Sequence, residues 1–334
     1  MKKLINDPAA YVDEALDGLC SAFRGYQRTG ATGRVIARPL SAVPGQVGVV
    51  SGGGFGHLPL FAGYVGGGLL NACAVGNVFA GPPADVCAET IRAADSGAGV
   101  LCVLGNYGGD RMSFAMASDE VDDDGISTET VIVGDDVASA APGERAKRRG
   151  VAGIVFSYKA AGAMAARGAP LDRVAAVAAR AAERTRTIGV ALSPCLIPGA
   201  AAPGFTVPDG AIEIGMGIHG EPGVEQRALP TADAVAEAMT TRLLDDAVKD
   251  GRRVALLVNS LGATPLEELL IVQRSARRQL AAAGLDIART YTGHYATSME
   301  MAGCSLSLLY LDEELEALLD APADCPFWPC PGPC

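Results

Sequence analysis

Short apolar runs alternate with longer amphipathic stretches along the first half of the chain. Three of these runs, Val47–Val50, Val100–Leu104 and Val131–Val133, are short and apolar, which is typical of buried strands. Helix-start residues and amphipathic spacing predict helices from Asp7 to about Phe23, from Pro83 to about Ala94, and over Leu171–Arg186. Strands separated by helices of this length indicate an α/β fold.

The second half repeats this alternation, and a second unit is predicted to begin near Ile188. Its elements are, in order, a strand from Ile188, strand Ala211–Gly217, helix Ala232–Lys249, strand Arg253–Val258, helix Pro265 to about Ala283, and strand Ser305–Leu311. We therefore expect two α/β domains, residues 1–187 and 188–334, each a mixed sheet flanked by helices.

Composition and charge narrow the classes of partner. Of the 334 residues, 49% are hydrophobic, and the net charge is −11, which argues against nucleic acid or an anionic membrane as the main partner. No apolar run reaches the roughly 18 residues of a membrane span, and the start, MKKLINDPAAYVDEA, lacks an apolar signal core. These absences predict a cytoplasmic protein. The acidic stretch Asp119–Gly125 is expected to form a solvated loop.

The nine cysteines contain no CxxC pair, and no metal site is predicted from them. Cys102 and Cys304 lie in or beside apolar runs, which suits their use as small core residues. Only the tail, CPFWPCPGPC, clusters cysteines, and its spacing fits no zinc pattern. A flexible tail is favoured over a zinc or disulfide role there, because cytosolic chains rarely keep disulfides.

Two of the three histidines, His57 and His219, follow predicted strands in glycine-rich turns, GGGFGH and GMGIHGEPG. Ligands of open α/β sheets bind at strand ends, and glycines let the backbone approach them closely. Titratable side chains in such turns are better placed for function than for packing. The alternative is a surface histidine in an ordinary turn, but two such turns on separate units favour function.

Asp110 belongs to the turn GNYGGD, directly after the predicted strand Val100–Leu104. An aspartate in this place can act as a general base or orient a ligand hydroxyl. The local pattern alone slightly favours a turn aspartate that caps a helix beginning near Met112.

The nucleotide-binding and hydrolase motifs that a sequence can reveal are missing. The chain has no GxxxxGK followed by Ser or Thr, and the glycines at 52–56 lack the GxGxxG spacing of a dinucleotide site. Neither a GxSxG elbow nor an HExxH pattern is present. ATP binding and NAD-dependent dehydrogenation on this chain are therefore poorly supported.

Several motifs together resemble one family, the substrate-binding K subunit of dihydroxyacetone kinase. They are VVSGGGFGHLP, GNYGGD, RGVAGIVFSYKAAGA, RTIGVALSPC, EIGMGIHGEPG and TSMEMAGCSLSLLYLDEEL, in the family's order from the first helix to about Asp324. The resemblance implies a homodimer of two-domain chains that holds a small ketose in the cytoplasm. It also implies no cofactor on this chain: ATP or ADP with Mg is expected on a partner L subunit, recharged in some systems by a phosphotransferase protein.

The resemblance also implies roles for individual residues. His219 matches the histidine that forms a covalent hemiaminal with the ketone of the substrate, which suits a neutral imidazole because it is a nucleophile. His57 and Asp110 match the residues that contact substrate hydroxyls and help to deprotonate the one that attacks phosphorus. The expected substrate-binding positions are Gly54, Phe55, Gly56, His57, Gly105 and Asp110.

Four positions depart from the family pattern near the expected ligand. Phe55 and Leu58 replace serine and glutamate of the usual GGGSGHEP, and Gly105 and Gly108 replace the lysine and threonine before and within NYTGD. These changes make the loop more apolar, which favours a longer or branched ketose such as erythrulose. They also leave open a ketose-sensing regulator without turnover. His294 lies outside the family's catalytic set.

Overall fold

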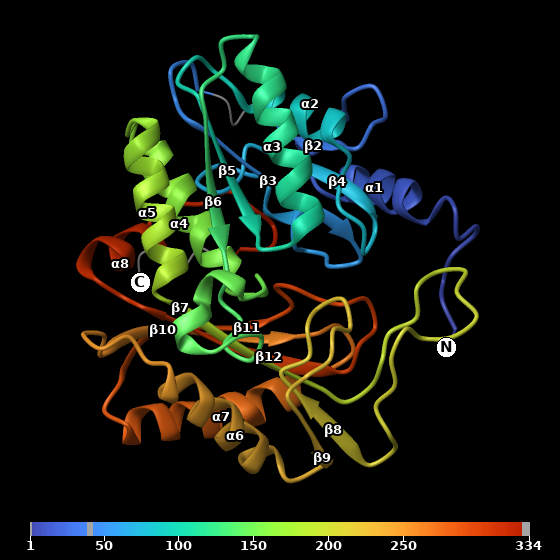
Figure 1. Cartoon of the computed structure of the whole chain (residues 1–334), viewed down its shortest axis with the longest axis vertical. Coiled ribbons are helices and arrows are strands. Elements are labelled where there is room, and N and C mark those ends of the chain that lie inside the picture. Colours follow the sequence, from blue (N-terminus) through green and yellow to red (C-terminus); the bar gives the residue numbers. More distant parts are fainter. Residues whose placement is uncertain (1, 39–42, 329–334) are drawn as a thin grey trace.

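The computed structural model describes residues 2–38 and 43–328 and confirms a mixed α/β fold with two six-stranded sheets (Figure 1). Strands of the first sheet all precede residue 134, and strands of the second all follow residue 184. The predicted division at residues 187 and 188 falls within strand β7 (Thr185–Ala191), the first strand of the second sheet.

The first sheet has the order β1-β2-β4-β3-β5-β6, and its last four strands are mutually parallel. The strands are β1 (Gln27–Thr29), β2 (Val35–Ala37), β3 (Gly48–Phe55), β4 (Ala72–Val78), β5 (Val100–Gly105) and β6 (Thr128–Val133). Because β3 and β5 run parallel, the segments that follow them emerge at the same edge of the sheet. His57 and Asp110 lie in those two segments.

Helices cover both faces of this sheet. Helices α2 (Ala84–Ala94) and α3 (Gly108–Asp122) pack on one face, where they share a core with alternate residues of β2 to β5. Helices α1 (Tyr11–Ala22), α4 (Ile154–Ala166) and α5 (Leu171–Glu183) pack on the other. Short 3₁₀ turns occur at Ala62–Tyr64 and Pro142–Lys147.

The second sheet has the order β11-β10-β12-β7-β8-β9 and is antiparallel except between β10 and β11. The further strands are β8 (Ala211–Ile214), β9 (Glu225–Ala228), β10 (Arg253–Ser260), β11 (Asp286–Gly293) and β12 (Gly303–Tyr310). Helices α6 (Ala232–Asp245) and α7 (Leu266–Ala282) cover its outer face, and α8 (Glu313–Leu319) follows β12.

Helix α4 joins the two units, because it is buried around almost its whole circumference. A helix that is apolar on every side belongs inside a core rather than on a surface. Its core includes Val49 and Leu101 of the first sheet as well as Leu257 and Leu309 of the second. The inner face of the second sheet therefore packs toward the first unit, which brings the turns of both sheets together.

Several expectations about local structure were wrong. The helix predicted to reach Arg186 ends at Glu183, because Thr185 and Arg186 already pair with β12. Residues Asp119–Asp122 belong to α3 rather than to a loop, since Val121 is fully buried on that helix. The glycines at 52–54 continue strand β3, and a Cβ on Gly53 would collide with the ring of Phe61.

Further observations concern the described part of the chain. No helix there is long and apolar enough to cross a membrane. Cys102 and Cys304 are buried in the sheets, as predicted. The expectation of a flexible tail is wrong for its described residues, because Trp328 is buried in the core, whereas Cys330 and Cys334 lie outside the described residues.

Candidate functional site

The two turns with predicted functional histidines meet between the units. His57 lies two residues after the C-terminal end of β3, and His219 lies in the connection between β8 and β9. Their imidazole rings pack edge to face with centroids 4.7 Å apart. Strand β8 ends at Ile214 rather than at Gly217 as predicted, so His219 lies in a longer connection.

His57 is fully buried and its tautomer follows from one contact. Its Nδ1 lies 2.7 Å from the carbonyl oxygen of Thr297, and because a carbonyl only accepts, Nδ1 carries the hydrogen. Its Nε2 is then an acceptor, and it is buried without a hydrogen-bond partner among the described residues. Burial, assisted by nearby His219, lowers the pKa of His57 to about 3, which keeps the ring neutral.

His219 is held by the carboxylate of Glu221, two residues further along. Oε1 of Glu221 lies 3.3 Å from Nδ1 of His219, and Oε2 accepts the backbone N–H of His219 at 2.9 Å. Burial opposes ionisation of Glu221, but the interactions with His219 outweigh it and lower the pKa of Glu221 to about 2. The carboxylate thus keeps a hydrogen on Nδ1 and leaves Nε2 of His219 with its lone pair.

Asp110 lies in the first turn of α3 and is 7% exposed. Burial raises its pKa to about 6, an effect that His219 partly offsets. The capping alternative finds no support, since Tyr107 is the N-cap residue and the Asp110 carboxylate forms no hydrogen bond within the described part of the chain. A carboxylate with a pKa near neutrality that interacts with His219 suits proton transfer.

Two aromatic residues that the sequence analysis did not select enclose the histidines. The ring of Phe79 stacks on His57 at 4.9 Å, and Tyr107 packs edge to face on His219 at 4.7 Å. The Tyr107 hydroxyl is buried, and among the described residues it has no hydrogen-bond partner. Tyr107 lies within the GNYGGD motif, which was a usable signal, whereas Phe79 follows strand β4, which the sequence analysis missed.

The predicted glycines border this site and allow close packing there. A Cβ on Gly54 would meet the backbone of Phe79 at 2.9 Å, and a Cβ on Gly105 would meet the ring of Tyr107 at 3.2 Å. Gly56 has a φ of +104°, in the region that favours glycine, and a Cβ there would meet Phe79 at 2.9 Å.

The side chain of Phe55 lies beside a different space. Its ring packs edge to face against Tyr11 at 6.0 Å and lines a cavity of about 510 Å³. Leu58 and Met299 line the same cavity. Two of the residues that depart from the family pattern therefore face this neighbouring cavity.

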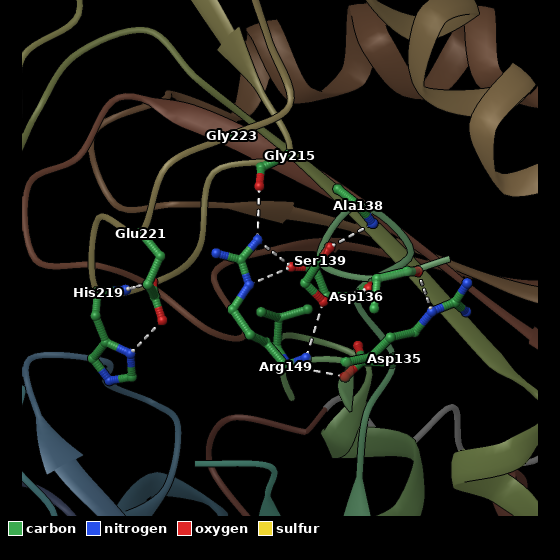
Figure 2. A network of polar contacts seen from close by, with 12 residues as sticks. Asp135, Asp136, Ala138, Ser139, Arg149, Gly215, His219, Glu221 and Gly223 are labelled. Carbon is green, nitrogen blue, oxygen red and sulfur yellow. Dashed lines mark hydrogen bonds and ion pairs between the residues drawn. The ribbon is translucent and has the colours of Figure 1, made fainter. Parts of the chain in front are cut away.

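A polar network supports the turn of His219 from the first unit (Figure 2). Arg149 donates from Nε to Asp136 at 2.9 Å and from Nη2 to the carbonyl oxygen of Gly215 at 2.8 Å. Burial raises the pKa of Asp136 to about 6 although Arg149 opposes the rise. Neighbouring Asp135 accepts two backbone N–H groups, at Val151 and Gly153. This network connects the segment after β6 to the segment after β8.

The structure thus brings together His57, Asp110 and His219, with Gly54, Gly56 and Gly105 around them. His294 is exposed, and its Nε2 lies 3.1 Å from the carbonyl oxygen of Gly262. Within residues 2–38 and 43–328, no group of three or more His, Cys, Asp or Glu side chains is arranged to hold a metal ion. The chemistry available is a nucleophilic imidazole, a neutral imidazole acceptor and a carboxylate base.

Comparison with known proteins gives a family and two relatives. The model of the Dak1 domain family matches residues 17–327. The chain is 45% identical to the D-erythrulose kinase of Mycolicibacterium smegmatis over 98% of this chain and 56% of the relative. It is 42% identical to the dihydroxyacetone-binding subunit DhaK of a PTS-dependent dihydroxyacetone kinase of Listeria innocua, over 98% of this chain and 100% of the relative. The chain therefore spans little more than half of the erythrulose kinase.

The chain is also similar throughout to solved structures, among them the following two. The dihydroxyacetone kinase from C. freundii, in complex with AMP-PNP and Mg²⁺, matches with a TM-score of 0.91 and 32% identity over 99% of this chain and 62% of that one. A dihydroxyacetone kinase operon co-activator matches with a TM-score of 0.88 and 30% identity over 94% of this chain and 97% of that one.

Proposed function

Because the chain belongs to the Dak1 domain family, we propose that it is the ketose-binding part of a ketose kinase. It binds a short ketose covalently on His219 and presents a terminal hydroxyl for phosphorylation. The observation that carries this proposal is the meeting of His219, held by Glu221, with the unpartnered Nε2 of His57 and the carboxylate of Asp110.

The covalent step uses the lone pair on Nε2 of His219. This pair attacks the ketone carbon and forms an N–C bond, while the π pair of the C=O bond moves to the oxygen, which takes a proton from solvent. The ring keeps its hydrogen on Nδ1 and becomes positively charged, and the carboxylate of Glu221 balances that charge. Polyols such as glycerol have no carbonyl and cannot form this bond.

The transfer step uses the other two residues. Asp110 takes the proton of the terminal hydroxyl as the oxygen attacks the phosphorus of the donor, and the bond from phosphorus to its leaving oxygen breaks. Nε2 of His57 accepts a hydrogen bond from a ketose hydroxyl and so satisfies an atom that is otherwise buried without a partner. A neutral imidazole in this place orients the ketose without adding charge.

The proposals for the phosphoryl donor and the assembly rest on the family resemblance. We infer that a nucleotide-binding L subunit supplies ATP, or ADP recharged by a phosphotransferase protein, with Mg²⁺, and that two copies of this chain form a homodimer in the cytoplasm. Dihydroxyacetone and erythrulose are the candidate substrates, because the relatives are named for them.

A second candidate is a ketose-sensing regulator that binds the sugar without turnover. The likeness to a dihydroxyacetone kinase operon co-activator favours it, since that likeness also covers nearly the whole chain. The two candidates share ketose binding and differ in whether a phosphorylated product forms.

A coupled kinase assay separates these candidates. The chain is mixed with a separately purified L subunit, MgATP or a phosphotransferase donor, and dihydroxyacetone or erythrulose, and the phosphorylated ketose is quantified. We expect product with the unmodified chain and with His294→Gln, a histidine outside the cluster, and none with His219→Ala. Ketose binding without product under every donor would support the regulator. Product at the normal rate from His219→Ala would contradict the covalent mechanism.

A further inference from the structure

One short segment, Thr297–Met299, contacts both histidine turns, although it belongs to neither. It follows β11 and precedes β12. We propose that this clamp segment sets the separation of His57 and His219, and that Ser298 is the positioning residue through which it holds the turn of His219. The inference rests on the proposed function, because it assigns the clamp segment to the geometry of the covalent step.

The clamp segment binds the turn of His57 through four hydrogen bonds. The backbone N–H of Thr297 donates to the carbonyl oxygen of His57 at 3.2 Å, and the N–H of Met299 donates to that of Gly56 at 2.8 Å. The Thr297 hydroxyl donates to the carbonyl oxygen of Leu58 at 2.9 Å. In return, Nδ1 of His57 donates to the carbonyl oxygen of Thr297 at 2.7 Å. Both the backbone and the ring of His57 are thus fixed by one neighbour.

The same segment reaches the turn of His219 through one side chain. The hydroxyl of Ser298 donates to the carbonyl oxygen of Ile218 at 2.5 Å, directly before His219. Ser298 is fully buried, and its own N–H donates to the carbonyl oxygen of Leu261 at 2.7 Å. A buried residue that is anchored through its hydroxyl to Ile218 and through its backbone N–H to Leu261 has little freedom to move, so it transmits the position of the segment to the turn.

Backbone conformation supports the same assignment. Among the described residues, Phe79 and Met299 are the two non-glycine residues with positive φ, at 55° and 54°. A Cβ on Gly56 would meet Phe79 at 2.9 Å and Met299 at 3.2 Å, so both strained residues pack against the residue before His57. Conformations that cost energy persist only where the surroundings enforce them, and they gather at functional sites.

The Ser298 hydroxyl bonds to the backbone of the turn, at the Ile218 carbonyl oxygen, so its effect on His219 passes through the turn. Covalent attack requires the nucleophile and the acceptor to lie within a fraction of an ångström of their productive positions. Without the Ser298 hydroxyl, the Ile218 carbonyl loses its donor and the turn can shift away from His57. Removal of the Ser298 hydroxyl should therefore weaken formation of the covalent adduct on His219.

The test compares Ser298→Ala with Ser307→Ala as a matched control. Ser307 is also fully buried, and its hydroxyl accepts a hydrogen bond from Thr187 at 2.7 Å, between β12 and β7. The probe is dihydroxyacetone labelled with ¹³C at the carbonyl carbon, whose NMR signal leaves the carbonyl region when the carbon becomes tetrahedral. Thermal unfolding of each variant reports the loss of stability, and a coupled assay gives kcat and KM.

We expect Ser298→Ala to weaken adduct formation by about tenfold to a hundredfold, with kcat falling along with it. Ser307→Ala is expected to lose comparable stability but to form the adduct as the unmodified chain does. Ser298→Thr, which keeps the hydroxyl, should recover most of the loss. Equal adduct formation by Ser298→Ala and the unmodified chain would overturn the clamp proposal alone. No adduct with the unmodified chain would instead overturn the proposed function.

Discussion

The rings of His57 and His219 lie 4.7 Å apart, edge to face, and their Nδ1 atoms are held by partners of different kinds. A backbone carbonyl accepts from His57, whereas the carboxylate of Glu221 holds His219. Burial outweighs the hydrogen bond to the Thr297 carbonyl, which by itself raises the pKa of His57, so the ring stays neutral. A carboxylate stabilises the charge that develops on His219 when its Nε2 bonds to a ketone. One histidine is thereby suited to orient the ketose and the other to capture it.

Replacing His57 by Gln is expected to change how stability depends on pH. Burial lowers the pKa of His57 from 6.5 to about 3, so the folded state binds its proton less readily than the unfolded state. The stability that the neutral, buried ring of His57 contributes is fully present above pH 6.5 and is lost as the pH falls toward 3. When the pH is lowered from 7 to 5, the free energy of unfolding of His57→Gln should therefore fall by about 2 kcal/mol less than that of the unmodified chain. Urea unfolding at both pH values measures this, and parallel losses would contradict it.

Asp110 should set the lower limit of the pH–activity profile. Burial raises its pKa to about 6, and only the ionised carboxylate accepts a proton. We expect kcat/KM for ketose phosphorylation to rise with pH through about 6 and then to level off. In Asp110→Asn, activity should drop by about 10²- to 10⁴-fold, and this rise should disappear. An unchanged profile in the variant would show that another group acts as the base.

Glu221→Gln separates the charge of Glu221 from its shape. Gln still accepts a hydrogen bond from Nδ1 of His219, but it no longer balances a positive ring. Because charge-assisted hydrogen bonds contribute about 1.5–3 kcal/mol, the affinity of the adduct should fall by roughly tenfold to a hundredfold. Glu225→Gln is the control, since Glu225 lies on the same hairpin and pairs with Arg242 instead. Isothermal titration with dihydroxyacetone measures both, and equal affinities would refute a role for the charge.

Arg149→Met should destabilise the fold, and a second change should restore part of the loss. Arg149 pairs with Asp136, which is nearly fully buried, so its removal leaves a buried carboxylate without its cationic partner, although the backbone N–H of Ala138 still donates to it. Breaking such a pair costs about 3–5 kcal/mol. Asp136→Asn added to Arg149→Met removes the buried charge and should recover a measurable share of that stability in urea unfolding. A double variant no more stable than Arg149→Met would contradict this account of the pair.

The α/β class could be predicted from the sequence, and so could the site residues that belong to recognisable turns. His57, Asp110 and His219 each follow a strand, and glycines around them mark places where backbones approach closely. The family resemblance implied that these residues converge, but the pattern along the chain could not show it, because the convergence depends on how the inner face of the second sheet packs against α4. Periodicity within either half contains no information about that packing.

Residues that act through long-range contacts were missed for the same reason. Thr297 and Ser298 have no local pattern that sets them apart, and they matter only because they contact turns that lie far away in the sequence. Phe79 follows β4, a strand of small residues with one glycine and one asparagine, which gives a weak apolar signal. Glu221 was visible within GIHGEPG, yet its role required the distance to His219.

The most direct measurement is a high-resolution electron-density map from crystals soaked in dihydroxyacetone. The account predicts continuous density at single-bond length between Nε2 of His219 and a tetrahedral C2 of the ketose, with one terminal hydroxyl within hydrogen-bond distance of Asp110. A ketose bound beside His219 with a planar carbonyl at van der Waals distance, or bound elsewhere on the chain, would contradict it.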